Sequence, residues 1–298
     1  MQQISDSPKE KMLNLIKTRL DRFFMAQARE RHKIMIALSK GGAMMNARHI
    51  DLTRPATWEF SGFSQNGEDG ILDVLRRQLL NGNRYFIEIG SADGLENNSA
   101  WLVVAERYSG IMVEGDPKLA ATATRAVIPY SIGAECRNMF VTRESAAELK
   151  ALAFHHDPDV FSLDIDGNDY YIAEALFAAG FRPKIFVVEY NSVFGAHRSV
   201  TVEYKPDFVF SKAHHSQLYY GVSIMGWRNF FARQGYRFVT TDVNGVNGFF
   251  VDPACFDATF LNQVQGQAFA SNCYQHRKFR MSDEQQFAMI ADQKFVTI

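Results

Sequence analysis

The stretch Phe86-Ile-Glu-Ile-Gly-Ser-Ala-Asp-Gly94 decides the fold class of this chain. Its apolar half predicts a buried strand, and its two glycines bracket a tight turn that leads to a helix near Asn97. Glycine lets a ligand approach the backbone, and a carboxylate at the strand end, here Glu88, can bind a cationic or hydroxyl-bearing group. The third glycine of the dinucleotide fingerprint is missing, and the carboxylate of Glu88 favours an ammonium over a pyrophosphate. For this motif alone, an ordinary strand-to-helix connection is the alternative.

Short apolar runs alternate with helical stretches from Arg84 onward, a pattern that predicts βαβ units and a parallel sheet. The expected strands are Tyr85–Ile89, Ile111–Val113, Val127–Tyr130, Val160–Leu163 and Ile185–Val188. The expected helices between them are Asn98–Arg107, Pro117–Arg125, Ser145–His155 and Asp169–Ala179. Strands in this rhythm predict a doubly wound, Rossmann-like α/β fold.

The C-terminal third departs from this alternation. It predicts a helix at Met225–Gln234 and then two strands, Tyr236–Thr241 and Gly248–Val251. The connection Asp242–Asn247 is short and contains Asn-Gly, so we expect it to close an antiparallel hairpin rather than to form a substrate site. A mostly parallel sheet that ends in such a hairpin is typical of class I methyltransferases rather than of dehydrogenases.

The N-terminal segment predicts a long helix that precedes the sheet. Ser7-Pro8-Lys9-Glu10 is a helix start with Ser7 as the cap, and apolar residues recur at helical spacing until Gly41-Gly42 breaks the pattern. We therefore expect a helical extension over residues 1–60 and a methyltransferase domain over residues 61–298. The extension either packs on its own domain or serves as a lid or as a contact in a homo-oligomer.

Composition narrows the class of protein and its partners. The 298 residues are 47% hydrophobic and 22% charged, which suits one elaborated domain with a large core. The net charge is -1, so the chain has no excess of positive charge with which to bind nucleic acid or an anionic membrane. We therefore expect a small-molecule partner. Three widely spaced cysteines match neither a disulfide framework nor a zinc motif. With no secretion signal or membrane-spanning run apparent, we expect a cytoplasmic protein.

A second signal is Glu114, at the end of the next expected strand. An acidic residue about 20 positions beyond the glycine turn is where doubly wound folds bind ribose hydroxyls. Alternatively, Glu114 and Asp116 only cap the helix that starts at Pro117, and we expect Asp116 to do so.

A third signal is a set of carboxylates that follow two neighbouring strands. Asp164, Asp166 and Glu189 are expected at the carboxyl edge of the sheet, where such folds bind their ligands. Converging carboxylate oxygens suit magnesium, but they equally suit a metal-free site that orients substrate hydroxyls. We expect Asp169 to be a helix cap instead.

Taken in order, five motifs resemble the FkbM-like branch of class I methyltransferases, over roughly Phe63 to Val251. They are Phe63-Ser-Gln-Asn-Gly-Glu-Asp69, Ile87-Glu-Ile-Gly-Ser-Ala-Asp-Gly94, Val113-Glu-Gly-Asp-Pro117, Leu163-Asp-Ile-Asp-Gly-Asn-Asp169 and Val188-Glu-Tyr-Asn191. The resemblance implies S-adenosylmethionine as the cofactor, with Glu114 on its ribose. The residues that it places at this cofactor are Ser64, Gln65, Glu88, Gly90, Asp93, Gly94, Glu114 and Asp164.

The chain departs from that branch at one motif. Many FkbM-type proteins have Asp-Val-Glu-Gly where this chain has Asp164-Ile-Asp-Gly167. The additional Asp169 is similar to magnesium-dependent sugar O-methyltransferases, which also place carboxylates after these two strands. The need for magnesium is therefore left open.

The loop between Asn191 and Tyr220 offers candidates for the general base. O-methylation needs a group that accepts the hydroxyl proton, and histidine is the commonest choice near neutral pH. His197 and His214 are such candidates, although a loop histidine is often merely solvated. Asp164 or Asp166 could serve instead.

These patterns lead to one main functional hypothesis. We expect an S-adenosylmethionine-dependent O-methyltransferase that acts on a hydroxyl of a sugar or glycosylated metabolite, with or without magnesium. The alternatives are a non-catalytic nucleotide-binding module of a polysaccharide or natural-product assembly system and a nicotinamide-dependent oxidoreductase.

Overall fold

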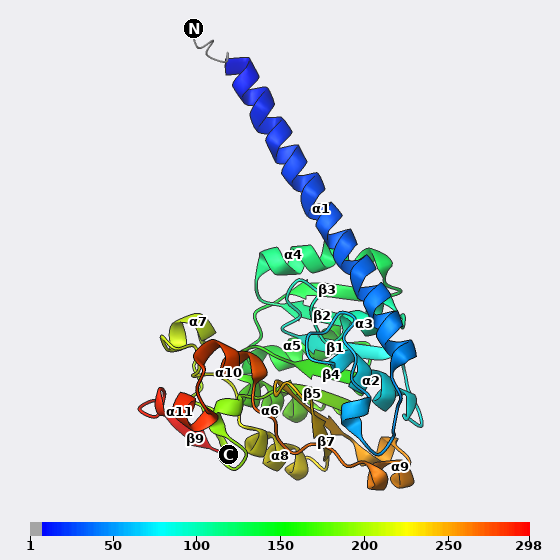
Figure 1. Cartoon of the computed structure of the whole chain (residues 1–298), viewed down its shortest axis with the longest axis vertical. Coiled ribbons are helices and arrows are strands. Elements are labelled where there is room, and N and C mark those ends of the chain that lie inside the picture. Colours follow the sequence, from blue (N-terminus) through cyan, green and yellow to red (C-terminus); the bar gives the residue numbers. More distant parts are fainter. Residues whose placement is uncertain (1–7) are drawn as a thin grey trace.

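The protein is built around one seven-stranded sheet, and the computed structural model describes residues 8–298 (Figure 1). The strand order is β3-β2-β1-β4-β5-β8-β7. The first five strands in this order are parallel, whereas β8 and β7 run antiparallel to their neighbours. The bounds are β1 Tyr85–Ile89, β2 Ser109–Glu114, β3 Ala134–Asn138, β4 Val160–Leu163, β5 Ile185–Glu189, β7 Arg237–Thr241 and β8 Asn247–Val251. This mostly parallel, doubly wound sheet with a terminal antiparallel hairpin confirms the expected Rossmann-like α/β fold.

Helices cover both faces of the sheet because alternate strand residues point to opposite sides. Phe86 packs with one layer of helices and Ile87 with the other. The first layer holds α1 Pro8–Ala47, α2 Glu68–Arg77, α3 Ala100–Val104 and α9 Ala258–Gln263. The second layer holds α5 Ala146–Leu152, α6 Asp169–Ala179 and α8 Ile224–Arg233, and α4 Pro117–Ala126 follows β2.

The last part of the chain packs beside the sheet. A two-stranded sheet pairs β6 Val200–Val202 with β9 Phe295–Thr297, close to the C-terminus. The short helices here are α7 Phe210–Ala213, α10 Cys273–Phe279 and α11 Asp283–Ala288. They surround a third apolar cluster built on Phe194 and Ile290. The sequence leaves the segment after Asp252 without an interpretation. Its part beyond α9 packs against the 191–222 loop region.

The expected third strand is wrong. Residues Val127–Tyr130 follow α4 as a short 3-10 turn, and the strand lies at Ala134–Asn138. Pro129 has no N–H to donate to a sheet, and β3 is an edge strand whose last two residues are exposed. The expected helix at Asn98–Arg107 is also too long, because α3 ends at Val104.

The N-terminal helix continues through the expected break. α1 runs to Ala47, past Gly41-Gly42, because Gly41 packs against the Trp101 ring, where a Cβ would lie 2.4 Å from Trp101 Cζ3. The glycine therefore serves close packing rather than termination. The predicted cap Ser7 lies outside the described residues. Among residues 8–298, no helix combines the length and the apolar character that crossing a bilayer requires.

The segment that joins α1 to α2 belongs to the core of the domain. Trp58 and Phe60 are almost fully buried in the cluster formed with α2 and α3. Arg48 at the end of α1 forms an ion pair with buried Asp73, 2.6 Å away. Part of the segment that the sequence assigns to the extension over residues 1–60 is thereby integrated with the sheet.

Candidate functional site

A cavity of about 530 Å³ opens at the carboxyl ends of β1, β2, β4 and β5. This volume is in the range of pockets that hold drug-sized ligands and cofactors. Eight of the predicted site residues line it: Ser64, Gln65, Glu88, Gly90, Glu114, Asp164, Asp166 and Glu189. Strand ends that are far apart in sequence meet here because parallel strands finish at the same edge.

The structure does not bring the other four predicted residues to this cavity. Asp93 accepts a hydrogen bond from Leu95 N and lies 3.6 Å from Lys33 of α1. Gly94 packs against α4, where a Cβ would lie 3.0 Å from that of Ala123. His197 is exposed in a turn, and His214 contacts Ser216 Oγ at 2.7 Å. None of the four is among the lining residues, so the two histidines are not placed as general bases.

Gly90 follows β1, at the point where the turn comes closest to the backbone of Asp164. Its φ is +86°, and a Cβ there would lie only 1.6 Å from the backbone oxygen of Asp164. Ala92 also has a positive φ, +48°, which is costly for a residue with a side chain. Backbone strain of this kind gathers at ligand sites, where the surrounding structure maintains it.

Glu88 is buried beneath this turn and organises the start of α3. Its carboxylate accepts hydrogen bonds from Asn97 Nδ2, Asn98 N and Ser99 N, and Ser99 Oγ also donates to it. Ser162 Oγ, which accepts from Asn98 Nδ2, is a further hydrogen-bonding neighbour of this carboxylate. Burial raises the pKa of Glu88 to about 7 against these hydrogen bonds. Glu88 is therefore a positioning residue that also borders the cavity.

Glu114 ends β2 on the opposite side of the turn. Oε2 accepts a hydrogen bond from Ala92 N at 2.8 Å, and Oε1 accepts one from Asp116 N at 2.7 Å. The backbone thus fixes the carboxylate while each oxygen keeps a lone pair for a ligand. Asp116 caps α4 by accepting from Lys118 N and Leu119 N, as the sequence predicts.

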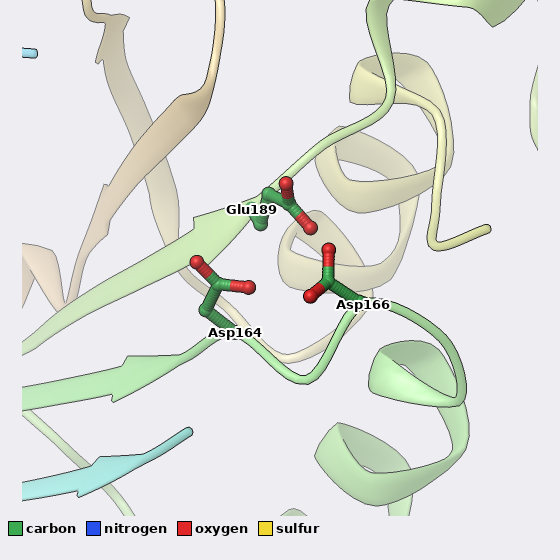
Figure 2. Close-up of side chains that lie close together, drawn as sticks. All are labelled: Asp164, Asp166 and Glu189. Atoms are coloured by element: carbon green, nitrogen blue, oxygen red, sulfur yellow. The ribbon is translucent and has the colours of Figure 1, made fainter. Parts of the chain in front are cut away.

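Asp164, Asp166 and Glu189 converge where β4 and β5 end (Figure 2). Each offers an oxygen that lies within 4.8 Å of those of the other two. Burial and the neighbouring carboxylates raise the pKa values of Asp164 and Glu189, and desolvation by the surrounding cavity wall raises that of Asp166, although part of its side chain is open to solvent. Asp166 sits in a loop with a φ of +53° and is exposed toward the cavity. We call these three residues the acidic trio.

Asp169 binds the backbone of the loop that carries Asp166 of the acidic trio. It is the first residue of α6 rather than its N-cap, and its carboxylate accepts hydrogen bonds from Ile165 N and Gly167 N at 2.9 and 2.8 Å. The prediction of a helix cap is therefore corrected, because the carboxylate binds the loop that carries Asp166. The N-cap position belongs to Asn168, whose side chain binds the backbone of Lys205 instead.

Eight polar residues of the cavity wall were not predicted as site residues: Asn66, Glu68, Glu96, Asn97, Asn98, Asp116, Asn168 and Asn247. The first two lie in the quoted motif Phe63–Asp69, which was the available signal for them. Asn247 begins β8, directly after the hairpin connection, and its position opposite Glu189 arises only from strand pairing. The hairpin itself forms as expected, although its last residue belongs to the cavity.

The sequence matches no family model, and no curated protein matches it. Among solved structures, the chain is similar to an O-methyltransferase from Bacillus cereus in complex with S-adenosylhomocysteine, at 14% identity and a TM-score of 0.39 over 74% of this chain and 89% of that one. It is also similar to the O-methyltransferase TomG from Streptomyces achromogenes, involved in tomaymycin synthesis and solved with S-adenosylmethionine. The identity there is 15% and the TM-score 0.41, over 71% and 93% of the two chains. With likenesses this distant, the function has to be argued from the cavity.

Proposed function

We propose that this chain is an S-adenosylmethionine-dependent O-methyltransferase. One observation carries the proposal: Gly90 and Glu114 border the same cavity from adjacent parallel strands, at the edge where doubly wound folds bind nucleosides. A carboxylate fixed at the end of the second strand suits the two ribose hydroxyls. The FkbM-like resemblance adds to this reading and remains a prediction of subfamily.

The cavity offers a complementary group for each part of S-adenosylmethionine. Glu114 would accept from the ribose hydroxyls, and the cofactor's ammonium would meet Asn97 and the carboxylate of Glu88. Leu119 and Phe140, both exposed apolar residues of the wall beyond Glu114, suit the adenine ring. Ser64 and Gln65 lie along the same cavity.

S-adenosylmethionine supplies an electrophilic methyl group on its sulfonium. In the proposed reaction the acceptor oxygen bonds to this carbon, the carbon–sulfur bond breaks, and the hydroxyl proton passes to a base. Asp164 or Asp166 would accept that proton, because both lie in the cavity and their pKa values are raised above the usual range, which makes each carboxylate a stronger base. Orientation of the hydroxyl by the trio would supply much of the remaining rate.

The acidic trio also fits a divalent cation. Oxygen ligands of magnesium lie about 2.1 Å from the ion, so oxygens on opposite sides of it are separated by about 4.2 Å. The trio offers three hard oxygens within 4.8 Å of one another, which is compatible with that separation. Asp164, Asp166 and Glu189 would hold the ion, which would favour the alkoxide form of the acceptor.

We propose a sugar hydroxyl as the acceptor and a cytoplasmic location.

Calorimetric titration with S-adenosylmethionine tests the proposal. Glu114→Gln is expected to weaken binding roughly ten- to a hundred-fold, because hydrogen bonds to a charged group contribute about 1.5–3 kcal/mol. Glu148→Gln, an exposed glutamate of α5 far from the lining residues, is the matched control and should bind like the unmodified chain. Absence of binding to the unmodified chain would refute the proposal. Binding without release of S-adenosylhomocysteine, across a panel of hydroxyl acceptors, would indicate a non-catalytic module.

A further inference from the structure

Asn247 lies beside the acidic trio with its amide held in one orientation. It is 3% exposed and pairs across strands with Glu189, so the two side chains share a face of the sheet. Asn247 Nδ2 donates to Glu68 Oε1 at 2.8 Å. Because a carboxylate only accepts hydrogen bonds, Glu68 fixes which end of the amide faces it, and Asn247 Oδ1 points elsewhere.

Asn247 Oδ1 has no hydrogen-bond partner within the described residues although it is buried. An unsatisfied buried acceptor costs about 1–3 kcal/mol, so a donor from a ligand or a water is expected there. Since Asn247 lines the cavity, the donor can come from a molecule bound inside it.

Asn97, which lines the same cavity, repeats this arrangement beside Glu88. Its Nδ2 donates to Glu88 Oε2, and its Oδ1 is likewise buried without a partner among residues 8–298. Two buried glutamates thus orient two asparagines so that each presents an acceptor oxygen. Asn97 lies by the proposed ammonium of the cofactor, and Asn247 lies by the trio, where the second substrate would react.

The charge of the wall limits what can enter. Within the described part of the chain, eight lining residues are acidic, and none of the lining residues is lysine, arginine or histidine. Of these eight acids, only Glu96 forms an ion pair with another residue in the range 8–298. Its partner is Lys33, 2.8 Å away. An acceptor that carries a phosphate or carboxylate would meet these like charges, and no basic side chain of the wall offsets them.

We propose that the acceptor is a neutral or cationic polyhydroxyl compound that donates a hydroxyl to Asn247 Oδ1 beside Glu189. This inference rests on the proposed methyltransferase function and specifies its second substrate. Glu68, which also borders the cavity, acts as a positioning residue through the hydrogen bond that orients the Asn247 amide. Nucleotide-linked and phosphorylated sugars are thereby disfavoured as acceptors.

Four sugars test the charge requirement, and each differs from glucose in one group: methyl glucoside, glucosamine, glucuronate and glucose 6-phosphate. Saturation-transfer NMR is run on the chain loaded with S-adenosylhomocysteine, whose own binding is measured first by calorimetry. We expect transfer to the first two sugars and none to the two anions. Equal transfer to an anion, or no transfer to any of the four, would overturn the inference. Failure of S-adenosylhomocysteine to bind would instead refute the proposed function.

Two matched variants test the role of the asparagines. Asn247→Ala should reduce the affinity for methyl glucoside about tenfold and leave that for S-adenosylhomocysteine unchanged, whereas Asn97→Ala should do the reverse. Glu68→Gln, which lets the Asn247 amide rotate, should weaken sugar binding without altering cofactor binding. Unchanged sugar binding in folded Asn247→Ala contradicts the assignment, and near-ultraviolet circular dichroism reports whether each variant folds.

A separate observation concerns the free half of α1, which extends well away from the sheet (Figure 1). Near its end the helix is anchored, with Ile34 and Ala37 buried and Glu30 bonded to Arg125 at 2.6 Å. The same face continues toward the N-terminus as a stripe of six large apolar residues, each 48–63% exposed. These are Met12, Leu13, Ile16, Leu20, Phe23 and Phe24. We call them the α1 stripe.

The charges around the α1 stripe favour an anionic partner. Residues 12–29 contain four basic residues and one acidic residue, a local excess that the net charge of -1 conceals. At 3.6 residues per turn, Lys17 and Arg19 flank the stripe on its two borders, while Arg22 and Arg29 lie opposite it. A second copy of the helix would bring these basic borders against each other, which is unfavourable. An anionic lipid surface pairs with them and buries the apolar face.

We infer that the free half of α1 binds an anionic membrane surface. Flotation with vesicles of equal parts phosphatidylglycerol and phosphatidylcholine should carry the full chain, and added salt should release it. Leu20→Glu should lose most of this binding, whereas Asn14→Glu, which makes the same charge change off the stripe, should retain most of it. No flotation, or equal loss in the two variants, overturns the inference. A dimer in solution that Leu20→Glu converts to monomer would show that a second copy occupies the stripe instead.

Discussion

Gly90→Ala is expected to abolish binding of S-adenosylmethionine and to lower the free energy of unfolding by about 3 kcal/mol or more. Two costs combine at this position. The backbone has a φ of +86°, which disfavours any residue with a side chain, and the added Cβ would lie 1.6 Å from the Asp164 oxygen. That oxygen belongs to the backbone and cannot rotate away, so β1 and β4 would have to separate where the ligand binds.

Gly235→Ala is the matched control for this substitution. Gly235 has a similar φ of +82°, but a Cβ there would meet nothing within 4 Å. It should lose only about 1–2 kcal/mol through backbone conformation and should bind the cofactor normally. Chemical denaturation and calorimetry measure the two quantities. Comparable losses of stability in both variants would show that the close contact at Gly90 contributes nothing.

The strands that the sequence predicts to the residue are those buried on all sides. β1 and β4 agree with the expected Tyr85–Ile89 and Val160–Leu163, because central parallel strands are continuous apolar runs. β3 has the sequence Ala-Glu-Cys-Arg-Asn and lies at the edge, so its pairing with β2 leaves no apolar pattern to detect. Strand prediction fails where hydrogen bonding to one neighbour, rather than burial, forms the strand.

The residues of the candidate site likewise fall into a group that the sequence predicts and a group that it does not. Glu88, Glu114, Asp164 and Glu189 follow strand ends, so the topology of a doubly wound fold is enough to bring them together. The contact between Glu68 and Asn247 joins residues 179 positions apart, and no local pattern records it. Asp93 belongs to the glycine-turn motif, yet it faces Lys33 of α1, a helix whose docking position the sequence does not specify.

Mg²⁺ is expected to stabilise the protein, and Asp164→Asn is expected to remove this effect. A ligand at 100 times its dissociation constant adds about 2.7 kcal/mol to the free energy of unfolding. The acidic trio would lose one of its three oxygen-bearing carboxylates in Asp164→Asn, and with it a negative charge. Asp292→Asn, an exposed aspartate near the C-terminus, is the control and should respond to Mg²⁺ like the unmodified chain. Thermal unfolding with Mg²⁺ or with a chelator measures the difference.

The pH dependence of this effect follows from the sign of the pKa shifts. The pKa values of Asp164 and Glu189 are raised above their usual values of about 4, so the folded protein binds more protons than the unfolded chain above that pH. Without Mg²⁺, stability should therefore fall as the pH rises from about 4 toward the folded-state pKa values. Because Mg²⁺ binds the deprotonated carboxylates, its stabilising effect should grow over the same range. In Asp164→Asn the fall in stability should be smaller, since one raised carboxyl group is gone. A Mg²⁺ effect that is independent of pH, or that persists in Asp164→Asn, would show that the ion binds elsewhere.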